Sequence, residues 1–139
     1  TSYEEGDWTP TMIETDGDVG GTWTVTDAHY VKIGALVQCW AVCTEINDTG
    51  GTGDFAIGGV PFAVEFPCVG GSLMMYGVDF SHTPPAGLPY SNNLNIWVKD
   101  DETLRIYETI DNGSWDAIDW TEIDDDQKIY FEFCYRTTQ

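Results

Sequence analysis

The chain has 139 residues, enough for one domain with its own core, and 24 Asp and Glu against five Lys and Arg give a formal charge of −19. Hydrophobic residues make up 42% of the chain and aromatic residues 14%, which is too apolar for a disordered tail. Because this charge repels phosphate backbones and anionic membranes, and no run of about 18 apolar residues exists, we expect neither nucleic acid as a partner nor membrane insertion.

The first two-thirds of the chain reads as short strands separated by turns, since no window of 12 or more residues has a clean helical period. The expected strands cover residues 22–26, 29–33, 36–45, 55–57, 61–66 and 72–80. A loop of glycines and short polar side chains at 47–54 and a proline loop at 81–89 divide them.

The last third contains a hairpin and a closing strand. Alternating apolar residues predict both of them, namely Leu94, Ile96 and Val98, then Leu104, Ile106 and Ile110 across a turn, and finally Ile129, Phe131, Phe133 and Tyr135. An acidic loop spans 111–126 between them. About eight or nine short strands without crossover helices predict an all-β fold, an antiparallel β-sandwich of jelly-roll-like type.

The four cysteines show no Cys-x-x-Cys spacing, which gives a zinc site little support. Cys39 and Cys43 lie in one expected strand, roughly 13 Å apart, beyond disulfide reach. Either could pair with Cys68 or Cys134, but without an export signal we expect reduced thiols.

Two segments combine flat aromatic rings with carboxylates and amides, the groups that stack on sugar rings and accept their hydroxyl hydrogen bonds. The candidate ligand-binding residues are Trp115, Asp116, Asp119 and Trp120 in the acidic loop and Tyr90 and Asn93 after the proline loop. Trp97 and Tyr107 occupy the polar faces of the hairpin strands and need an explanation as well. Packing in a core or between subunits is the open alternative for all four of Trp97, Tyr107, Trp115 and Trp120.

Catalytic patterns are weak. His29 and His82 are the only histidines and neither has a flanking nucleophile motif, while 24 acids always offer some carboxylate pair for glycoside hydrolysis. We therefore expect no enzyme and no cofactor. Calcium is an alternative role for the runs at 16–18 and 124–126, although neither matches the usual calcium loop and we interpret both as solvated surface.

Several motifs together resemble the C-terminal domains of bacteriophage tail-fibre and virion fibre proteins. They are Glu-Glu-Gly-Asp-Trp-Thr-Pro at 4–10, Gly-Thr-Trp at 21–23, Lys-Ile-Gly at 32–34, Ile-Gly-Gly-Val-Pro-Phe at 57–62 and the ending at 131–137. The likeness spans nearly the whole chain, but 92–126 matches no family pattern.

The resemblance implies a single fibre-tip domain over 1–139, with 1–10 entering from a preceding shaft. It also implies a homotrimer on the virion, assembled in the host cytoplasm, that attaches to host cell-surface polysaccharide or protein. Two alternatives stay open: a structural decoration or trimerisation module without ligand, and a polysaccharide depolymerase.

Overall fold

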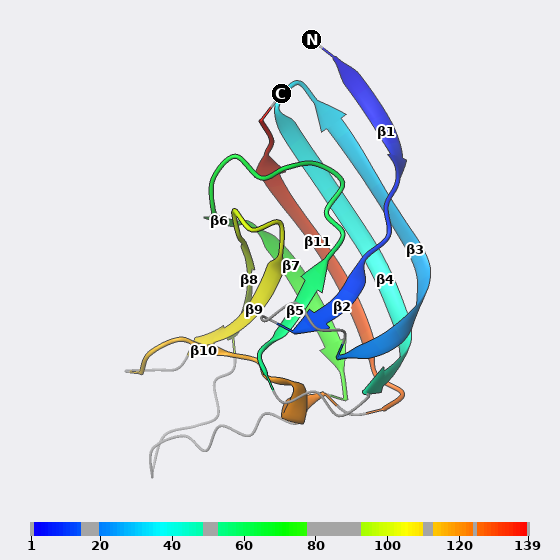
Figure 1. The fold of residues 1–139 in the computed structure, drawn as a ribbon, viewed down its shortest axis with the longest axis vertical. Coiled ribbons are helices and arrows are strands. Elements are labelled where there is room, and N and C mark those ends of the chain that lie inside the picture. Colours follow the sequence, from blue (N-terminus) through cyan, green and yellow to red (C-terminus); the bar gives the residue numbers. More distant parts are fainter. Residues whose placement is uncertain are drawn as a thin grey trace.

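The chain folds into two antiparallel β-sheets packed face to face, an all-β sandwich, as the sequence predicts. This computed structural model describes residues 2–14, 20–48, 53–77, 93–109, 113–123 and 125–138. Figure 1 shows the two sheets as two layers, with the long strands on one side. No helix within the described ranges is long and apolar enough to cross a membrane.

The first sheet has five strands in the order β1-β3-β4-β11-β7. Its strands are β1 (Tyr3–Asp7), β3 (Gly21–Ile33), β4 (Leu36–Asp48), β11 (Lys128–Arg136) and β7 (Gly71–Tyr76). The second sheet follows the order β2-β5-β9-β8-β6, and β10 pairs with β9 beside this path. Its strands are β2 (Thr11–Glu14), β5 (Phe55–Gly58), β6 (Cys68–Val69), β8 (Asn93–Val98), β9 (Leu104–Thr109) and β10 (Asp116–Ala117).

The core lies between the sheets and is built mainly from alternate residues of the longer strands, together with the wholly buried β5. On β4 and β11 the buried residues are Val37, Cys39, Ala41, Cys43, Ile129, Phe131, Phe133 and Tyr135. From the second sheet come Met12, Phe55, Ile57, Ile96, Val98, Leu104 and Ile106. The other parity of β4 holds Leu36, Trp40 and Val42, so this strand presents apolar side chains to both sides.

Several expected elements differ from the observed ones. The strands expected at 22–26 and 29–33 are one strand, β3, whose pairing with β4 shifts register between Val25 and Asp27. The strand expected at 61–66 does not form, and only Val64 makes an isolated bridge, to Thr137. The 1–10 segment, expected as an entry to the fold, contains β1, and the acidic loop contains β10 and the 3-10 turn η1 (Trp120–Glu122).

Trp8 follows β1 and anchors it to the core. Its ring meets Phe131 and Phe133 edge-on at centroid distances of 6.1 and 5.6 Å, and its Nε1–H donates to the Trp40 carbonyl at 3.2 Å. The strand ends at Tyr3, Ile33, Leu36 and Arg136 lie in one row, so β1 begins and β11 ends at the same end of the sandwich (Figure 1).

Candidate functional site

An aromatic groove lies on the side of the second sheet that faces away from the core. Three aromatic rings form its wall: Trp97 from β8, Tyr107 from β9 and Trp115 just before β10. The ring centroids of Trp97 and Tyr107 are 5.6 Å apart, and those of Tyr107 and Trp115 are 6.1 Å apart. Val69, Asn95 and Thr109 complete the lining of this cavity of about 370 Å³.

Strand alternation explains how these rings come together. In the β8–β9 hairpin Ile96, Val98, Leu104 and Ile106 point into the core, so the residues between them point outward. The short strand β10 then places Ala117 opposite Tyr107, which brings Trp115 beside the hairpin.

The groove offers unusually accessible apolar surface. The residue Trp115 is 73% exposed and Val69 68% exposed, whereas Trp97 and Tyr107 are partly buried against each other. An open aromatic wall of this kind fits a flat, partly apolar ligand better than a small ion.

Polar groups stand at both ends of the groove. At one end the Asn93 carbonyl accepts hydrogen bonds from Asn95 Nδ2 at 3.4 Å and from Thr109 Oγ1 at 3.2 Å. At the other end Lys99 Nζ lies 5.3 Å from the centre of the Trp97 ring.

The charges at the lysine end are fixed by one carboxylate. Asp101 is ion-paired with Lys99 at 3.1 Å and Arg105 at 3.2 Å, and it accepts the Thr103 hydroxyl at 2.5 Å. Partial burial alone would raise the pKa of Asp101, but the hydrogen bonds from Thr103 and Lys99 outweigh burial and lower it. The carboxylate therefore holds both cations in place beside the aromatic wall.

The structure brings some of the predicted site residues to the groove and separates others. Trp115 forms part of the wall, and Asn93 supplies the carbonyl at the polar end. Asp116 is exposed but does not line the groove, because it pairs with Glu108, whose side chain faces away from the groove, whereas Ala117 pairs with Tyr107. Trp120, in contrast, is fully buried in the core, with its ring centroid 5.2 Å from that of Phe55.

The remaining two predicted site residues, Asp119 and Tyr90, are not among the described residues that line the groove. Asp119 is partly buried, and its backbone N–H donates to Glu122 Oε2 at 3.0 Å in the turn η1. Tyr90 lies outside the described residues, as does most of the proline loop.

Three lining residues were not predicted. Asn95 shares the outward parity of Trp97, and Thr109 shares that of Tyr107, so alternation could have identified both. Val69 sits on the two-residue strand β6, which has no periodicity to reveal which way it faces.

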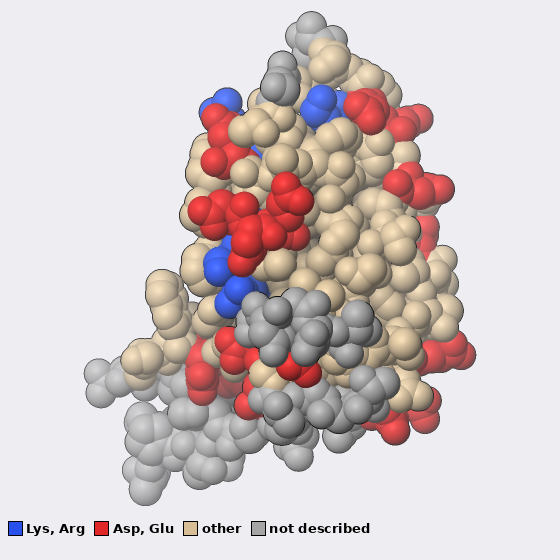
Figure 2. Space-filling view, viewed as in Figure 1, with Lys and Arg blue, Asp and Glu red and all other residues tan. Residues whose placement is uncertain are grey.

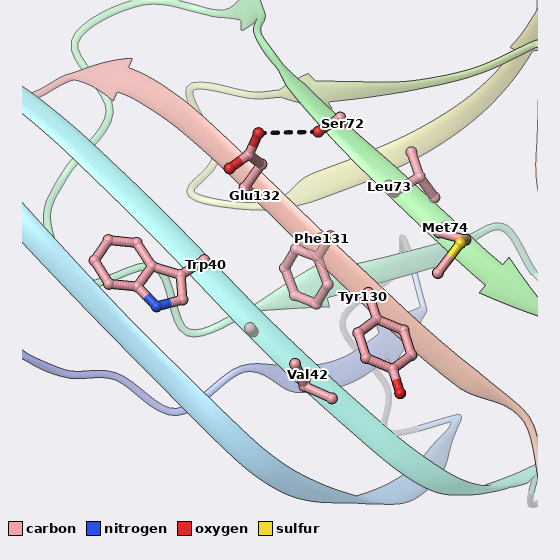
Figure 3. A pocket seen from close by; sticks show the side chains of 9 residues that line it. Trp40, Val42, Ser72, Leu73, Met74, Tyr130, Phe131 and Glu132 are labelled. Carbon is pink, nitrogen blue, oxygen red and sulfur yellow. Dashed lines mark hydrogen bonds between the residues drawn. The ribbon is translucent and has the colours of Figure 1, made fainter.

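A second surface is the outer face of the five-stranded sheet, the side turned away from the other sheet. A shallow groove of about 360 Å³ crosses it, lined by residues of β4, β11 and β7 (Figure 3). Figure 3 shows Trp40 and Val42 on β4, Tyr130 on β11 and Met74 on β7. In the same groove, Ser72 Oγ donates a hydrogen bond to Glu132 Oε1 at 3.0 Å.

His29 lies near the β1 side of this outer face. Its Nδ1 is 2.5 Å from Asp7 Oδ1 and its Nε2 is 2.6 Å from Asp27 Oδ1. Because both ring nitrogens face carboxylates, His29 is not placed to activate a serine or cysteine. His82, the other histidine, lies outside the described residues.

Among the charged side chains in the view of Figure 2, acidic ones predominate, and the few basic groups sit beside acidic ones. Within the described ranges no group of three or more His, Cys, Asp or Glu side chains could hold a metal ion. The calcium alternative falls mainly outside the described residues, which omit 16–18 and Asp124.

The four cysteines are free thiols. Cys39 and Cys43 are buried in the core, and this burial raises the pKa of each thiol to about 12. Such thiols are protonated and serve as small core residues rather than nucleophiles.

No protein-family model, curated protein or solved structure matches the chain.

Proposed function

We propose that this chain is the receptor-binding tip of a bacteriophage virion fibre, a non-enzymatic domain that binds glycan on the host cell surface. The observation that carries the proposal is the outward aromatic wall of Trp97, Tyr107 and Trp115. Aromatic faces stack on the apolar side of a pyranose ring, and such contacts tolerate a wet, shallow site.

The rim of the groove suits a sugar as well. Asn95 and Thr109 provide an amide and a hydroxyl beside the rings, the types of group that exchange hydrogen bonds with sugar hydroxyls. The cavity volume of about 370 Å³ falls in the range of small-molecule sites.

The placement of the groove is compatible with a tip. β1 begins at one end of the sandwich, while β10 and η1 lie toward the other end (Figure 1). The family resemblance adds the virion location, the homotrimer and the attachment role to the proposal.

The test is glycan binding by wild type, Trp97→Ala and Trp115→Ala on an array of bacterial surface polysaccharides, followed by calorimetry with the glycan that binds. We expect each substitution to weaken binding at least tenfold, because each removes one stacking surface. Phe66→Ala is the matched control, since Phe66 is an exposed aromatic residue (46%) outside the groove.

Two outcomes would contradict the proposal: a wild-type protein that binds no glycan on the array, or groove variants that bind like wild type. We expect no reducing ends to be released from host polysaccharide by the purified protein. Their release would instead identify a depolymerase.

A virion decoration or trimerisation module without ligand is the second candidate. The exposed apolar residues of the outer face favour it, because they suit contacts between chains rather than contact with water. This candidate predicts that groove variants leave host adsorption of the phage unchanged.

A further inference from the structure

Two of the five basic residues of the chain stand at one end of the aromatic groove. Lys99 Nζ lies 5.3 Å from the centre of the Trp97 ring, and Arg105 pairs with Trp97 across the β8–β9 hairpin. Outward positions recur every second residue, so Lys99 follows Trp97 on the outer side of β8 and Arg105 precedes Tyr107 on the outer side of β9. The row of outward aromatic residues therefore ends at a pair of cations.

This pair carries more charge than its acidic partner cancels. Asp101 faces both cations, with its Oδ2 at 3.1 Å from Lys99 Nζ and 3.2 Å from Arg105 Nη2. One carboxylate against two cations leaves a surplus of one positive charge beside Trp97. The side chains of Lys99 and Arg105 are only 21% and 15% exposed, so a ligand at this end of the groove meets partly desolvated charge, which acts more strongly than charge in open water.

The neighbouring acids leave the groove itself free of negative charge. Asp100 and Glu102 lie in the same turn as Asp101, but both are exposed, so water and salt screen them more strongly than the two cations. Glu108 is buried on the core side of β9, and Asp116 pairs with it rather than with Tyr107. Among the described residues no acidic side chain lines the groove, although the chain holds 24 Asp and Glu. The groove lining therefore does not repel an anion.

We propose that the groove takes an acidic sugar, a pyranose that carries a carboxylate, with its ring on the aromatic wall and its carboxylate at Lys99. The inference rests on the proposed glycan-binding function and adds the class of glycan. Lys99 lies two positions beyond Trp97, about 7 Å along the strand, which is within reach of a substituent on a ring stacked in the groove. A lysine ammonium group is a compact charge on a flexible stem, so it can follow the carboxylate.

The net charge of −19 does not exclude an anionic ligand. At physiological ionic strength, charges more than about 8 Å apart are largely screened, so the groups nearest the carboxylate decide the sign of the interaction. Those groups are Lys99 and Arg105, with Asp101 shared between them. A neutral sugar gains only the stacking, whereas an acidic sugar gains the stacking and the surplus positive charge. The groove is therefore expected to select acidic polysaccharides.

The experiment uses an array of bacterial surface polysaccharides in two forms, native and after carbodiimide–borohydride reduction, which converts each carboxylate to an alcohol and keeps the sugar ring. We expect wild type to bind native acidic polysaccharides, and reduction to weaken that binding at least tenfold. Lys99→Gln should weaken binding of the native form at least fivefold and of the reduced form less than twofold. Lys99→Arg keeps the charge and should bind both forms within twofold of wild type.

Lys32→Gln is the matched control. The Lys32 ammonium lies 5.2 Å from the centre of the Phe62 ring, much as Lys99 lies over Trp97, but Lys32 belongs to β3 of the other sheet. The substitution removes the same charge away from the groove and should change binding of either form less than twofold. Circular dichroism and thermal unfolding of every variant check that the sandwich is intact.

Three results would overturn the inference: binding confined to neutral polysaccharides, equal binding of native and reduced forms, or native binding that Lys99→Gln leaves unchanged. Trp115→Ala tests the proposed function separately, since the loss of a stacking ring should weaken binding of both forms alike. A protein that binds no polysaccharide in either form would contradict the proposed function itself, and this inference with it.

Discussion

Trp115 and Trp120 stand five positions apart in one acidic segment, yet the first is 73% exposed and the second is fully buried. Long-range backbone hydrogen bonds explain this difference in exposure. The Trp120 N–H donates to the Gly53 carbonyl at 3.0 Å, and the Phe55 N–H donates to the Ile118 carbonyl at 2.8 Å. These bonds connect residues 118–120 to the start of β5, which places the Trp120 ring in the core beside Phe55.

Buried thiols make the stability of the protein sensitive to alkali. Cys39 and Cys43 titrate near 9 in an unfolded chain, and burial raises the pKa of each to about 12 in the fold. Between these values the unfolded state binds fewer protons than the folded state, so the free energy of unfolding falls as pH rises. Each thiol is expected to contribute about 1.4 kcal/mol per pH unit.

Urea unfolding at pH 8 and pH 10 measures this loss. Cys39→Ala and Cys43→Ala should each reduce the fall between the two pH values, whereas Cys68→Ala, at a partly buried thiol, should reduce it less. An unchanged pH dependence in the Cys39→Ala, Cys43→Ala double variant would contradict the assignment. Tyr135 adds to the same trend, because burial raises its pKa as well.

At the scale of strands, elements with one apolar parity were predicted closely, and so were β4 and β5, whose apolar runs are bounded by turn residues. The β8–β9 hairpin and β11 alternate between buried and outward residues and were expected almost to the residue. β1 was not expected because Tyr-Glu-Glu-Gly-Asp has no apolar alternation, and it forms as an edge strand paired with β3. The segment 61–66 has strand-like composition, but only the isolated bridge at Val64 links it to a partner.

The same distinction applies to the candidate site. The alternation of apolar and polar residues predicted that Trp97 and Tyr107 lie on the outward side of the hairpin, and the structure confirms that prediction. Pattern could not place Trp115 against Tyr107, because that contact depends on the pairing of β10 with β9. Val69 lines the groove because β6 pairs with β8, and that pairing could not be predicted from the local sequence either.

The turn after β5 depends on Gly59. Its φ of +84° lies in the left-handed region, and a Cβ added there would come within 2.2 Å of the Thr9 carbonyl oxygen. Gly59→Ala is expected to lower the free energy of unfolding by about 1–3 kcal/mol, because the left-handed backbone conformation and the contact with the Thr9 carbonyl both disfavour the added methyl group.

Urea unfolding tests the effect of Gly59→Ala, because a lower midpoint with an unchanged m-value means a lower free energy of unfolding. Gly53→Ala is the control, since its added Cβ would meet only the flexible Glu14 carboxylate, at 3.2 Å. Equal stability of the two variants would show that the β5 turn tolerates a side chain.

At the scale of the whole molecule, the charge of −19 opposes compactness through repulsion between carboxylates. We expect the unfolding midpoint in urea to rise between 0.05 and 1 M NaCl, because salt screens that repulsion. KCl at the same ionic strength is the control and should give the same rise. A midpoint that stays constant or falls with salt would refute the expectation.

The position of β1 also determines how the domain would carry tension. β1 begins at the end of the sandwich away from β10, and its five residues from Tyr3 to Asp7 pair with Ile33 to His29 of β3 (Figure 1). A pull between the start of β1 and a ligand held near β10 runs along the strand axis. The β1–β3 hydrogen bonds are then loaded together in shear instead of opening one after another, which makes the domain a mechanical clamp along its long axis.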